Sequence, residues 1–338
     1  MRTFLRVLAL SLPLVFTACG DDNAGSSTTT APASAPVERL PDPNPHPVPR
    51  FNADSAYAFV AKQVSFGPRV MNTPAHDATE AWLIGKLKAF GAEVTPQKFT
   101  ATAYDGTPLR STNIIGRYNP QAPYRISLAA HWDTRHIADS ALEDDPDAVV
   151  NGADDGASGV GVLLEVARLL GEATPRSIGV DILLFDAEDY GESGGGATES
   201  WGLGAQHYSR NVGSPKPQYG ILLDMVGAKD ARFAREGISM QVAPQLVDRI
   251  WSLAQSMRFG DYFVNQNQRP VTDDHYFVNT IARYPMIDII NFSGETESGF
   301  VPHWHTDDDN MDVIDKETLR AVGQVITAVV YREAAGTF

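Results

Sequence analysis

The sequence predicts an α/β fold, a three-layer α/β/α sandwich around a central, mostly parallel (mixed) sheet. Two observations predict it. Apolar runs of strand length alternate with segments of helical spacing along the chain. Three of these runs, at 180–185, 220–224 and 286–290, are mostly apolar and place apolar residues at neighbouring positions instead of alternating them with polar ones. Strands with both faces covered by helices have this pattern, so helices are expected on both sides of the sheet.

The individual elements follow from local spacing. Helical spacing recurs at 53–64 and 77–90, and Gly91 follows the second as a C-cap. Further strands are expected at 93–99, 113–118 and 125–130. The segment 159–170 predicts an apolar helix buried on more than one face, and 244–257 and 315–331 predict covering helices.

The first 18 residues predict a signal peptide. Arg2 and Arg6 precede the apolar run 8–16, which is shorter than the roughly 20 residues needed to span a bilayer. The run ends at Thr17-Ala18-Cys19, which resembles a bacterial lipobox. We therefore expect an exported lipoprotein anchored to the membrane through lipid on Cys19, with outer-membrane sorting that faces the periplasm. The alternative is a plain signal peptide cut nearby.

Two regions follow the signal. Residues 19–50 are rich in Pro, Ser and Thr, and predict a disordered tether behind the lipidated cysteine. Residues 51–338 predict one catalytic domain. Cys19 is the single cysteine, so disulfides and cysteine metal sites are excluded and any metal ligand must be His, Asp or Glu. The net charge of −15 argues against nucleic-acid binding, which requires a basic surface.

Acidic and histidine residues lie at the carboxyl ends of the expected strands or in adjacent loops, where α/β sheets form their sites. They are His131, Asp133, Asp154, Asp155, Glu188, Asp189 and Asp224, with Asp273, Asp274, His275, His303 and His305 in later loops. A lone Asp at such a position is usually a turn or cap residue, as Asp154 could be. The joint placement instead predicts a metal site, and carboxylates with imidazoles suit zinc.

Four motifs carry a resemblance to the zinc aminopeptidase superfamily and, within it, to the glutaminyl cyclases. They are FDAEDYG at 185–191, LDMVGA at 223–228, TDDH at 272–275 and HWHTD at 303–307. In the bacterial cyclases a catalytic Glu directly precedes an Asp zinc ligand, as Glu188 precedes Asp189 here. Co-catalytic aminopeptidases usually have Glu at that second position. The resemblance implies an aminopeptidase-like sandwich.

The resemblance also implies roles for individual residues. One zinc ion per chain would be held by Asp155, Asp189 and His305. Glu188 would act as general base and then acid, while Asp273 and Asp224 form hydrogen bonds near the leaving nitrogen. Two further pairs are implied: His131 and Asp133 as a supporting or vestigial second-metal site, and Trp304 and Trp201 as walls of the substrate pocket.

The implied reaction converts the N-terminal glutamine of peptides or proteins to pyroglutamate and releases ammonia, with zinc polarising the γ-carbonyl. Two alternatives stay open. A di-zinc aminopeptidase would use the same ligands together with His131 and Asp224. A non-catalytic binding lipoprotein could share the fold. The sequence indicates neither the physiological peptides nor the oligomeric state.

Overall fold

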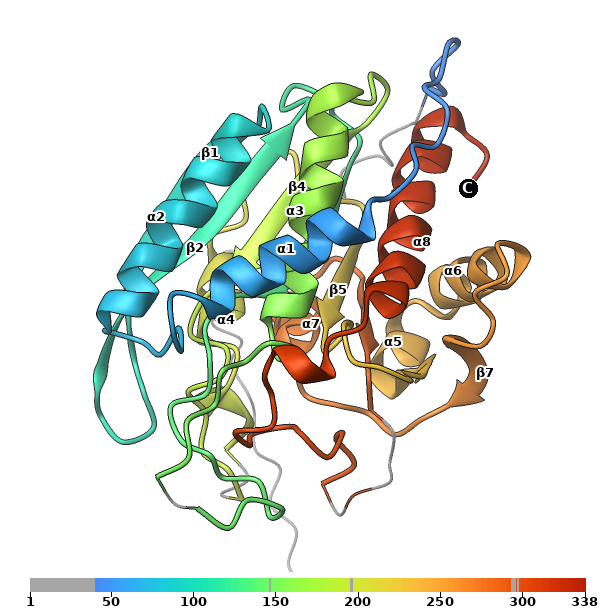
Figure 1. Cartoon of the computed structure of the whole chain (residues 1–338). Coiled ribbons are helices and arrows are strands. Elements are labelled where there is room, and N and C mark those ends of the chain that lie inside the picture. The colour runs from blue at the N-terminus through green and yellow to red at the C-terminus, as the bar shows by residue number, and fades with distance from the viewer. Residues whose placement is uncertain (1–39, 146, 195–196, 293–295, 297) are drawn as a thin grey trace, which may run out of the picture. The chain divides into compact units, whose positions relative to one another are not determined.

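The computed structural model describes residues 40–145, 147–194, 197–292, 296 and 298–338, which belong to one compact unit (Figure 1). Its central sheet has the strand order β1-β2-β4-β3-β5-β8. The strands are β1 (Glu93–Thr102), β2 (Pro108–Tyr118), β3 (Arg125–His131), β4 (Gly179–Phe185), β5 (Gly220–Asp224) and β8 (Met286–Ile290).

The sheet is mixed, as expected. β4, β3, β5 and β8 run parallel to one another. β1 and β2 form an antiparallel hairpin, and β2 pairs antiparallel with β4. The carboxyl ends of the four parallel strands therefore lie along one edge of the sheet. His131, Phe185, Asp224 and Ile290 are the last residues of these strands.

Helices cover both faces of the sheet, which confirms the predicted three-layer sandwich (Figure 1). One face carries α1 (Ala53–Val64), α2 (Pro74–Ala89), α3 (Ala157–Glu172) and α8 (Lys316–Ala335). The other face carries α4 (Leu203–Arg210) and α7 (Asp274–Phe277), with the turn η2 (Val278–Ala282). Beside the edge strand β8 lie α5 (Gly237–Val242) and a small sheet of β6 (Phe233–Arg235) and β7 (Phe263–Asn267). Helix α6 (Pro244–Ser256) packs against α5, α8 and β7. Short turns η1 (Thr198–Ser200) and η3 (Met311–Val313) complete the elements.

Successive residues of a central strand pack into two different cores. Ile182 and Leu184 of β4 lie in the larger cluster with α1, α3 and α8, whereas Leu183 and Phe185 pack with α4. Side chains of a strand point alternately to its two faces, so a doubly covered strand is apolar at most positions. The apolar residues 182–185 of β4 reflect this arrangement, and the buried Asp181 is paired with Arg125 at 2.7 Å.

Helix α3 is buried along nearly its whole length, as predicted. Gly161 faces Val60 and the carbonyl of Ala56 on α1, and a Cβ there would overlap the Val60 side chain. The small residue lets the two helices approach closely and places the start of α3 against the sheet edge where the acidic residues gather. Helix α1 has the predicted bounds, while α2 begins at Pro74 after the N-cap Thr73, slightly earlier than expected.

The expected signal peptide, the lipid-bearing Cys19 and the tether up to residue 39 lie outside the described residues. From residue 40 the segment contacts α8: the backbone N–H of Asp42 donates to the carbonyl of Ala334, and Nε2 of Gln324 donates to that of Pro49. Within the described part of the chain, no helix is both long and apolar enough to span a bilayer.

Candidate active site

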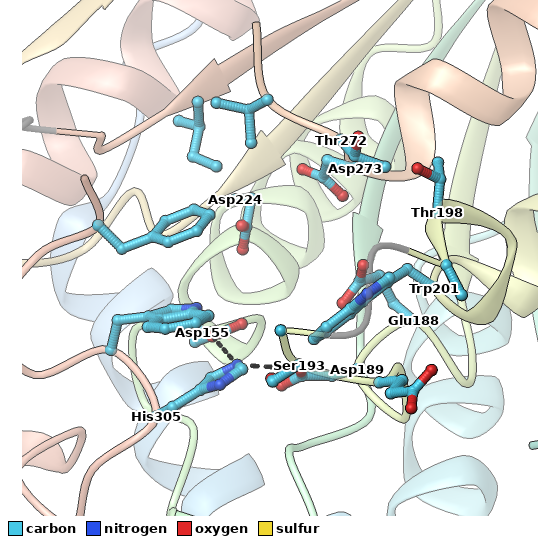
Figure 2. A pocket seen from close by; sticks show the side chains of 17 residues that line it. Asp155, Glu188, Asp189, Ser193, Thr198, Trp201, Asp224, Thr272, Asp273 and His305 are labelled. Carbon is cyan, nitrogen blue, oxygen red and sulfur yellow. Dashed lines mark hydrogen bonds and ion pairs between the residues drawn. The ribbon is translucent and has the colours of Figure 1, made fainter. Parts of the chain in front are cut away.

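Two groups of potential metal ligands meet at the carboxyl edge of the sheet and share Asp155. Asp155, Asp189 and His305 each place one donor atom within 4.8 Å of the other two, and His131, Asp155 and Asp224 do the same. All five side chains are buried. Figure 2 shows the first group on one side of a pocket, with His305 joined to Asp155 and Asp189. The residues that the resemblance assigned to the metal are thus brought together.

The loop that presents Asp155 requires glycine. Gly152 has a φ of +61°, and a Cβ there would overlap the methyl group of Thr134 and the carbonyl oxygen of Asp155. The buried guanidinium of Arg69 donates to the carbonyls of Asn151 and Gly152. Close packing at Gly152 and the hydrogen bonds from Arg69 therefore fix the loop conformation. This conformation directs the Asp155 carboxylate into the cleft.

Two carboxylates support the same loop. Asp309 accepts the backbone N–H of Asp154 at 2.7 Å and that of Asp155 at 3.2 Å. Asp154 does not cap α3, whose N-cap is Gly156 without a side-chain hydrogen bond. Instead it accepts the N–H of Gly227 at 2.7 Å and lies 2.9 Å from Nε2 of His303. Asp154 thus links the Asp155 loop to the segment after β5.

Asp133 positions the Glu188-Asp189 segment. Its two oxygens accept the backbone N–H groups of Glu188 and Asp189, both at 3.1 Å. The same carboxylate lies 3.5 Å from Nδ1 of His131, close enough for a charge interaction but long for a hydrogen bond. Ala187, just before the pair, has a φ of +52°, a strained conformation that turns both carboxyls away from the strand.

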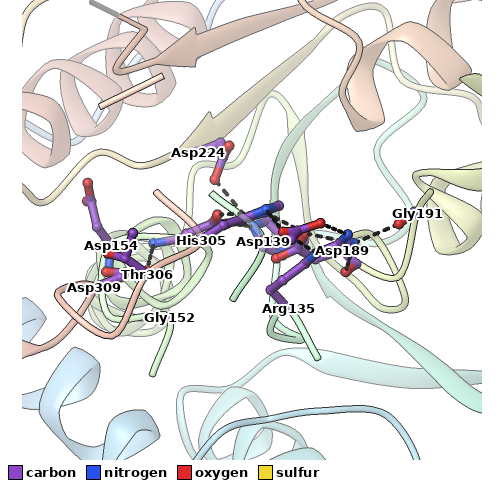
Figure 3. A network of polar contacts seen from close by, with 12 residues as sticks. Arg135, Asp139, Gly152, Asp154, Asp189, Gly191, Asp224, His305, Thr306 and Asp309 are labelled. Carbon is purple, nitrogen blue, oxygen red and sulfur yellow. Dashed lines mark hydrogen bonds and ion pairs between the residues drawn. The ribbon is translucent and has the colours of Figure 1, made fainter. Parts of the chain in front are cut away.

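His305 is held by a network that the sequence did not indicate (Figure 3). Nδ1 of His305 lies 2.8 Å from Asp139, whose carboxylate is paired with the fully buried guanidinium of Arg135. Arg135 also donates to the backbone carbonyls of Asp189 and Gly191, at 2.9 and 2.8 Å. One arginine therefore links the supports of two candidate metal ligands, Asp189 and His305.

Aromatic rings enclose the pocket. Trp304 stacks on His305 with 3.6 Å between ring centroids, and on Phe300 at 4.5 Å. Trp201 forms another wall and lies under the Arg135 guanidinium. The cavity measures about 310 Å³ and is also lined by Glu188, Asp224, Asp273, Val271 and Ile290. Its size suits one small side chain with its adjoining backbone. Trp304 and Trp201 are where the resemblance placed them.

The acidic groups of the pocket have perturbed proton affinities. Burial, with Asp189 and Asp273 nearby, raises the pKa of Glu188 well above its usual range, although His131 acts in the opposite direction. Burial and the charge of Asp155 raise the pKa of Asp224. Burial lowers the pKa of His305, but Asp189 and Asp139 outweigh it and raise that pKa to about 9.

The donor set fits a zinc ion. Two carboxylates and one imidazole are zinc ligands, and three protein ligands leave a position open for substrate. Oδ2 of Asp189 is buried without a hydrogen-bond partner in the described residues, as expected for an atom reserved for a cation. The Asp139–His305 contact is the carboxylate–imidazole support that zinc-binding histidines commonly have.

Comparison with known proteins agrees with this geometry. The profile of peptidase family M28 matches residues 113–330, which include every candidate ligand. The chain belongs to peptidase family M28. This confirms the expected relationship to zinc aminopeptidases and places the sandwich among Zn-dependent exopeptidase-like folds.

Several relatives are close to this M28 chain. A Zn-dependent exopeptidase from Parabacteroides distasonis is 48% identical, with a TM-score of 0.81 over 84% of this chain and 99% of that one. Porphyromonas gingivalis glutaminyl cyclase is 47% identical, with a TM-score of 0.80 over 84% and 98%. Glutaminyl-peptide cyclotransferase from Drosophila melanogaster is 26% identical over 289 residues, 77% of this chain and 75% of the relative. The predicted resemblance to glutaminyl cyclases is therefore confirmed.

Sequence reasoning missed four residues of this M28 site: Arg69, Arg135, Asp139 and Asp309. Each lies in a loop or turn and acts through a partner distant in sequence, such as Asp139 with His305, 166 residues away. The available signal was weak. Arg135 and Asp139 follow the His131-Trp132-Asp133 motif within one short loop. This proximity to the motif is the signal in the sequence that indicates them as supporting residues.

Proposed function

We propose that this chain is a zinc-dependent glutaminyl-peptide cyclotransferase, which converts an N-terminal glutamine to pyroglutamate and releases ammonia. One observation carries the proposal: Glu188 lines the same small, aromatic-walled pocket as Asp155, Asp189 and His305. The identity of 47% to a glutaminyl cyclase over most of the chain supports the same reaction.

Glu188 suits a group that takes a proton and later returns it. Its raised pKa brings the carboxyl nearer to neutral pH, where a general base and acid works best. In its ionised form it would accept a proton from the α-ammonium of the substrate, freeing the amine to attack the γ-carbon. It would then return the proton to the leaving ammonia. Because amine and amide belong to one residue, orientation in the pocket supplies much of the rate.

The remaining pocket residues orient the substrate. Zinc, when bound by Asp155, Asp189 and His305, would supply Lewis-acid polarisation of the γ-carbonyl. Asp224 and Asp273 line the pocket and can accept hydrogen bonds from the amide nitrogen that leaves. Trp201 and Trp304 exclude water and limit the side chain to a small one.

A di-zinc aminopeptidase is the second candidate, and the group of His131, Asp155 and Asp224 favours it. Their donor atoms lie within 4.8 Å of one another, and Nε2 of His131 is 2.9 Å from Asp155 and 3.3 Å from Asp224. A second metal could therefore be held beside the first. In that enzyme the metals held by these residues together with Asp189 and His305 would lower the pKa of a water molecule, and Glu188 would serve as the base that takes its proton.

One experiment separates the two. The zinc-loaded protein is incubated with a glutaminyl dipeptide amide and with an N-terminal leucine peptide, both followed by mass spectrometry, and zinc is counted on the same sample. We expect loss of one ammonia from the first substrate, an intact second substrate and about one zinc per chain. Cleavage of the leucine peptide with about two zinc ions would establish the aminopeptidase.

We also propose that the protein is an exported lipoprotein, sorted to the outer membrane. The basic residues Arg2 and Arg6, the apolar run 8–16 and the small residues before Cys19 support this. Metabolic labelling with a fatty acid, followed by membrane fractionation, tests it against Cys19→Ser. Label and outer-membrane recovery that depend on Cys19 are expected, and equal labelling of both proteins would refute lipidation at this cysteine.

A further inference from the structure

A group of buried acidic residues lies behind the pocket wall formed by Asp273. We call Asp273, Asp274 and Asp288 the rear carboxyl cluster. Asp274 and Asp288 have no exposed surface, and Asp273 is 5% exposed. Asp288 stands in the centre of the buried strand β8, while Asp273 caps α7. Of the three, only Asp273 lines the pocket. Figure 2 shows Asp273 and Asp224 among the lining residues.

The nearest imidazole already has a partner. Nε2 of His275 lies 3.1 Å from Glu236, whose carboxylate also accepts the N–H groups of Ile238, Ser239 and Val271. Nδ1 of His275 is 3.8 Å from Asp288, too long for a hydrogen bond. His275 therefore pairs with Glu236 and leaves the rear carboxyl cluster without a hydrogen-bonded cation.

The cluster has more acceptor oxygens than donors. Oδ1 of Asp273 accepts the N–H of Asp274, but Oδ2 of Asp273 and both carboxyl oxygens of Asp274 and Asp288 receive no N–H or O–H from the described residues. Asp288 lies close enough to Asp273 for a hydrogen bond between the two side chains once one of them carries a proton. No lysine or arginine of the described chain forms an ion pair with any of the three. Ionised oxygens without a hydrogen-bond partner are energetically unfavourable in a buried site. Neighbouring carboxyls relieve this cost by sharing a proton.

We propose that Asp288 is a protonated positioning residue that donates a hydrogen bond to Asp273 and holds it as an ionised acceptor facing the pocket. The proposal rests on the cyclotransferase function proposed above. Asp273 would then accept an N–H from the γ-amide of glutamine, while its charge would repel the γ-carboxylate of glutamate. Asp288 therefore contributes to the choice of glutamine over glutamate without touching the substrate.

The surroundings of Asp288 support its protonated form. Burial, followed by the charges of Asp273, Glu236 and Asp224, raises the pKa of Asp288 well above its usual range, and every charged group in that set is acidic. Burial also raises the pKa of Asp273 and of Asp274, but for Asp273 the charge of His275 and the backbone N–H of Asp274 act in the opposite direction. The titratable groups that face it from neighbouring elements are Asp224 on β5, Glu236 before α5, and Asp273, Asp274 and His275 at the start of α7.

A bound cation is the competing explanation. Asp273, His275 and Asp288 each offer one donor atom within 4.8 Å of the other two. A metal there would satisfy the same oxygens without a proton. Metal analysis distinguishes the two: Asp155→Ala should remove the catalytic zinc and leave no metal, whereas a metal retained in Asp155→Ala and lost in Asp288→Ala would overturn the proposal.

Infrared spectroscopy tests the proton directly and needs no turnover, so it stands apart from the proposed activity. The difference spectrum between the zinc-loaded wild type and Asp288→Asn at neutral pH should contain a carboxylic-acid C=O band that shifts in D₂O. The exposed Asp261→Asn provides the control and should give no such band. A difference spectrum that contains ionised-carboxylate bands and no carboxylic-acid band would show that Asp288 is charged, and would refute the proposal.

Kinetics test its positioning role. Asp288→Leu should lower kcat/KM for a glutaminyl substrate about 10–100-fold, because Asp273 loses its fixed orientation. Asp288→Asn, whose amide can still donate to Asp273, should recover most of this loss at the same thermal stability. Equal losses in both variants, or a Leu variant that is folded and fully active, would refute the role of Asp288.

Discussion

Nδ1 of His305 lies 2.8 Å from Oδ1 of Asp139, while Nε2 of the same ring lies 3.1 Å from Oδ1 of Asp189. One nitrogen is thus engaged by a supporting carboxylate and the other faces the candidate metal site. The backbone φ of His305 is +57°, so the ring is presented from a strained position. We therefore expect the orientation of the His305 ring to depend on its contact with Asp139.

Replacement of Asp139 should therefore weaken metal binding. Asp139→Ala leaves Nδ1 of His305 without its acceptor and Arg135 without its ion pair, so we expect zinc affinity to fall about 10–100-fold. Competition with a fluorescent chelator measures the affinity. Asp144→Asn, an exposed carboxylate of the same loop, is the matched control and should bind zinc like the wild type. Equal affinity in Asp139→Ala would mean that His305 does not need this support.

Glu188→Gln separates catalysis from metal binding. The glutamine can neither accept nor return the substrate proton, so kcat should fall by a factor on the order of 10² to 10⁴. The zinc content should stay unchanged, because Asp155, Asp189 and His305 remain. Turnover and zinc are measured on one preparation, with the exposed Glu93→Gln as control. Near-normal turnover in Glu188→Gln would remove Glu188 from the mechanism.

Removal of the metal should lower thermal stability. Without a cation, Asp155 and Asp189 face each other in a buried site, and a ligand that binds only the folded state stabilises it by about 2.7 kcal/mol at 100 times its Kd. A chelator should lower the Tm, and added zinc should restore it. Asp155→Ala is the matched control: its Tm should not respond to either treatment. If neither the chelator nor added zinc changes the Tm of the wild type, zinc does not contribute to its thermal stability.

The lowered pKa of Glu236 predicts that the free energy of unfolding depends on pH. Burial opposes its ionisation, but His275 and backbone N–H groups outweigh burial and lower its pKa from 4.5 to about 2. Its stabilising contribution is therefore complete above about pH 4.5 and is lost as the pH falls towards 2. Glu236→Gln should lose about 3 kcal/mol in the free energy of unfolding at pH 7, and less at pH 3.5.

Urea unfolding at the two pH values checks this, with Glu93→Gln as the control for an exposed carboxylate. A loss that is the same at both pH values would show that the ionised form of Glu236 is not what stabilises the fold.

Much of the fold could be predicted because its signals are local. The mostly apolar run at 180–185 indicates a strand covered on both faces, and the helix 53–64 begins and ends where spacing predicts. The elements that were missed, such as α4, α5 and the β6–β7 pair, have at most eight residues each. Their packing against larger elements, more than their own propensity, stabilises them.

The sequence by itself determined which residues end the parallel strands. It thereby placed His131, Glu188, Asp189 and Asp224 at one edge, because parallel strands direct their carboxyl ends to the same side. Only the tertiary structure decided which of three consecutive aspartates matters: Asp309 is fully buried and holds the Asp155 loop, whereas Asp307 and Asp308 are exposed. An isolated aspartate has the same chemistry at every position, and its role depends on the distant groups that the fold brings to it.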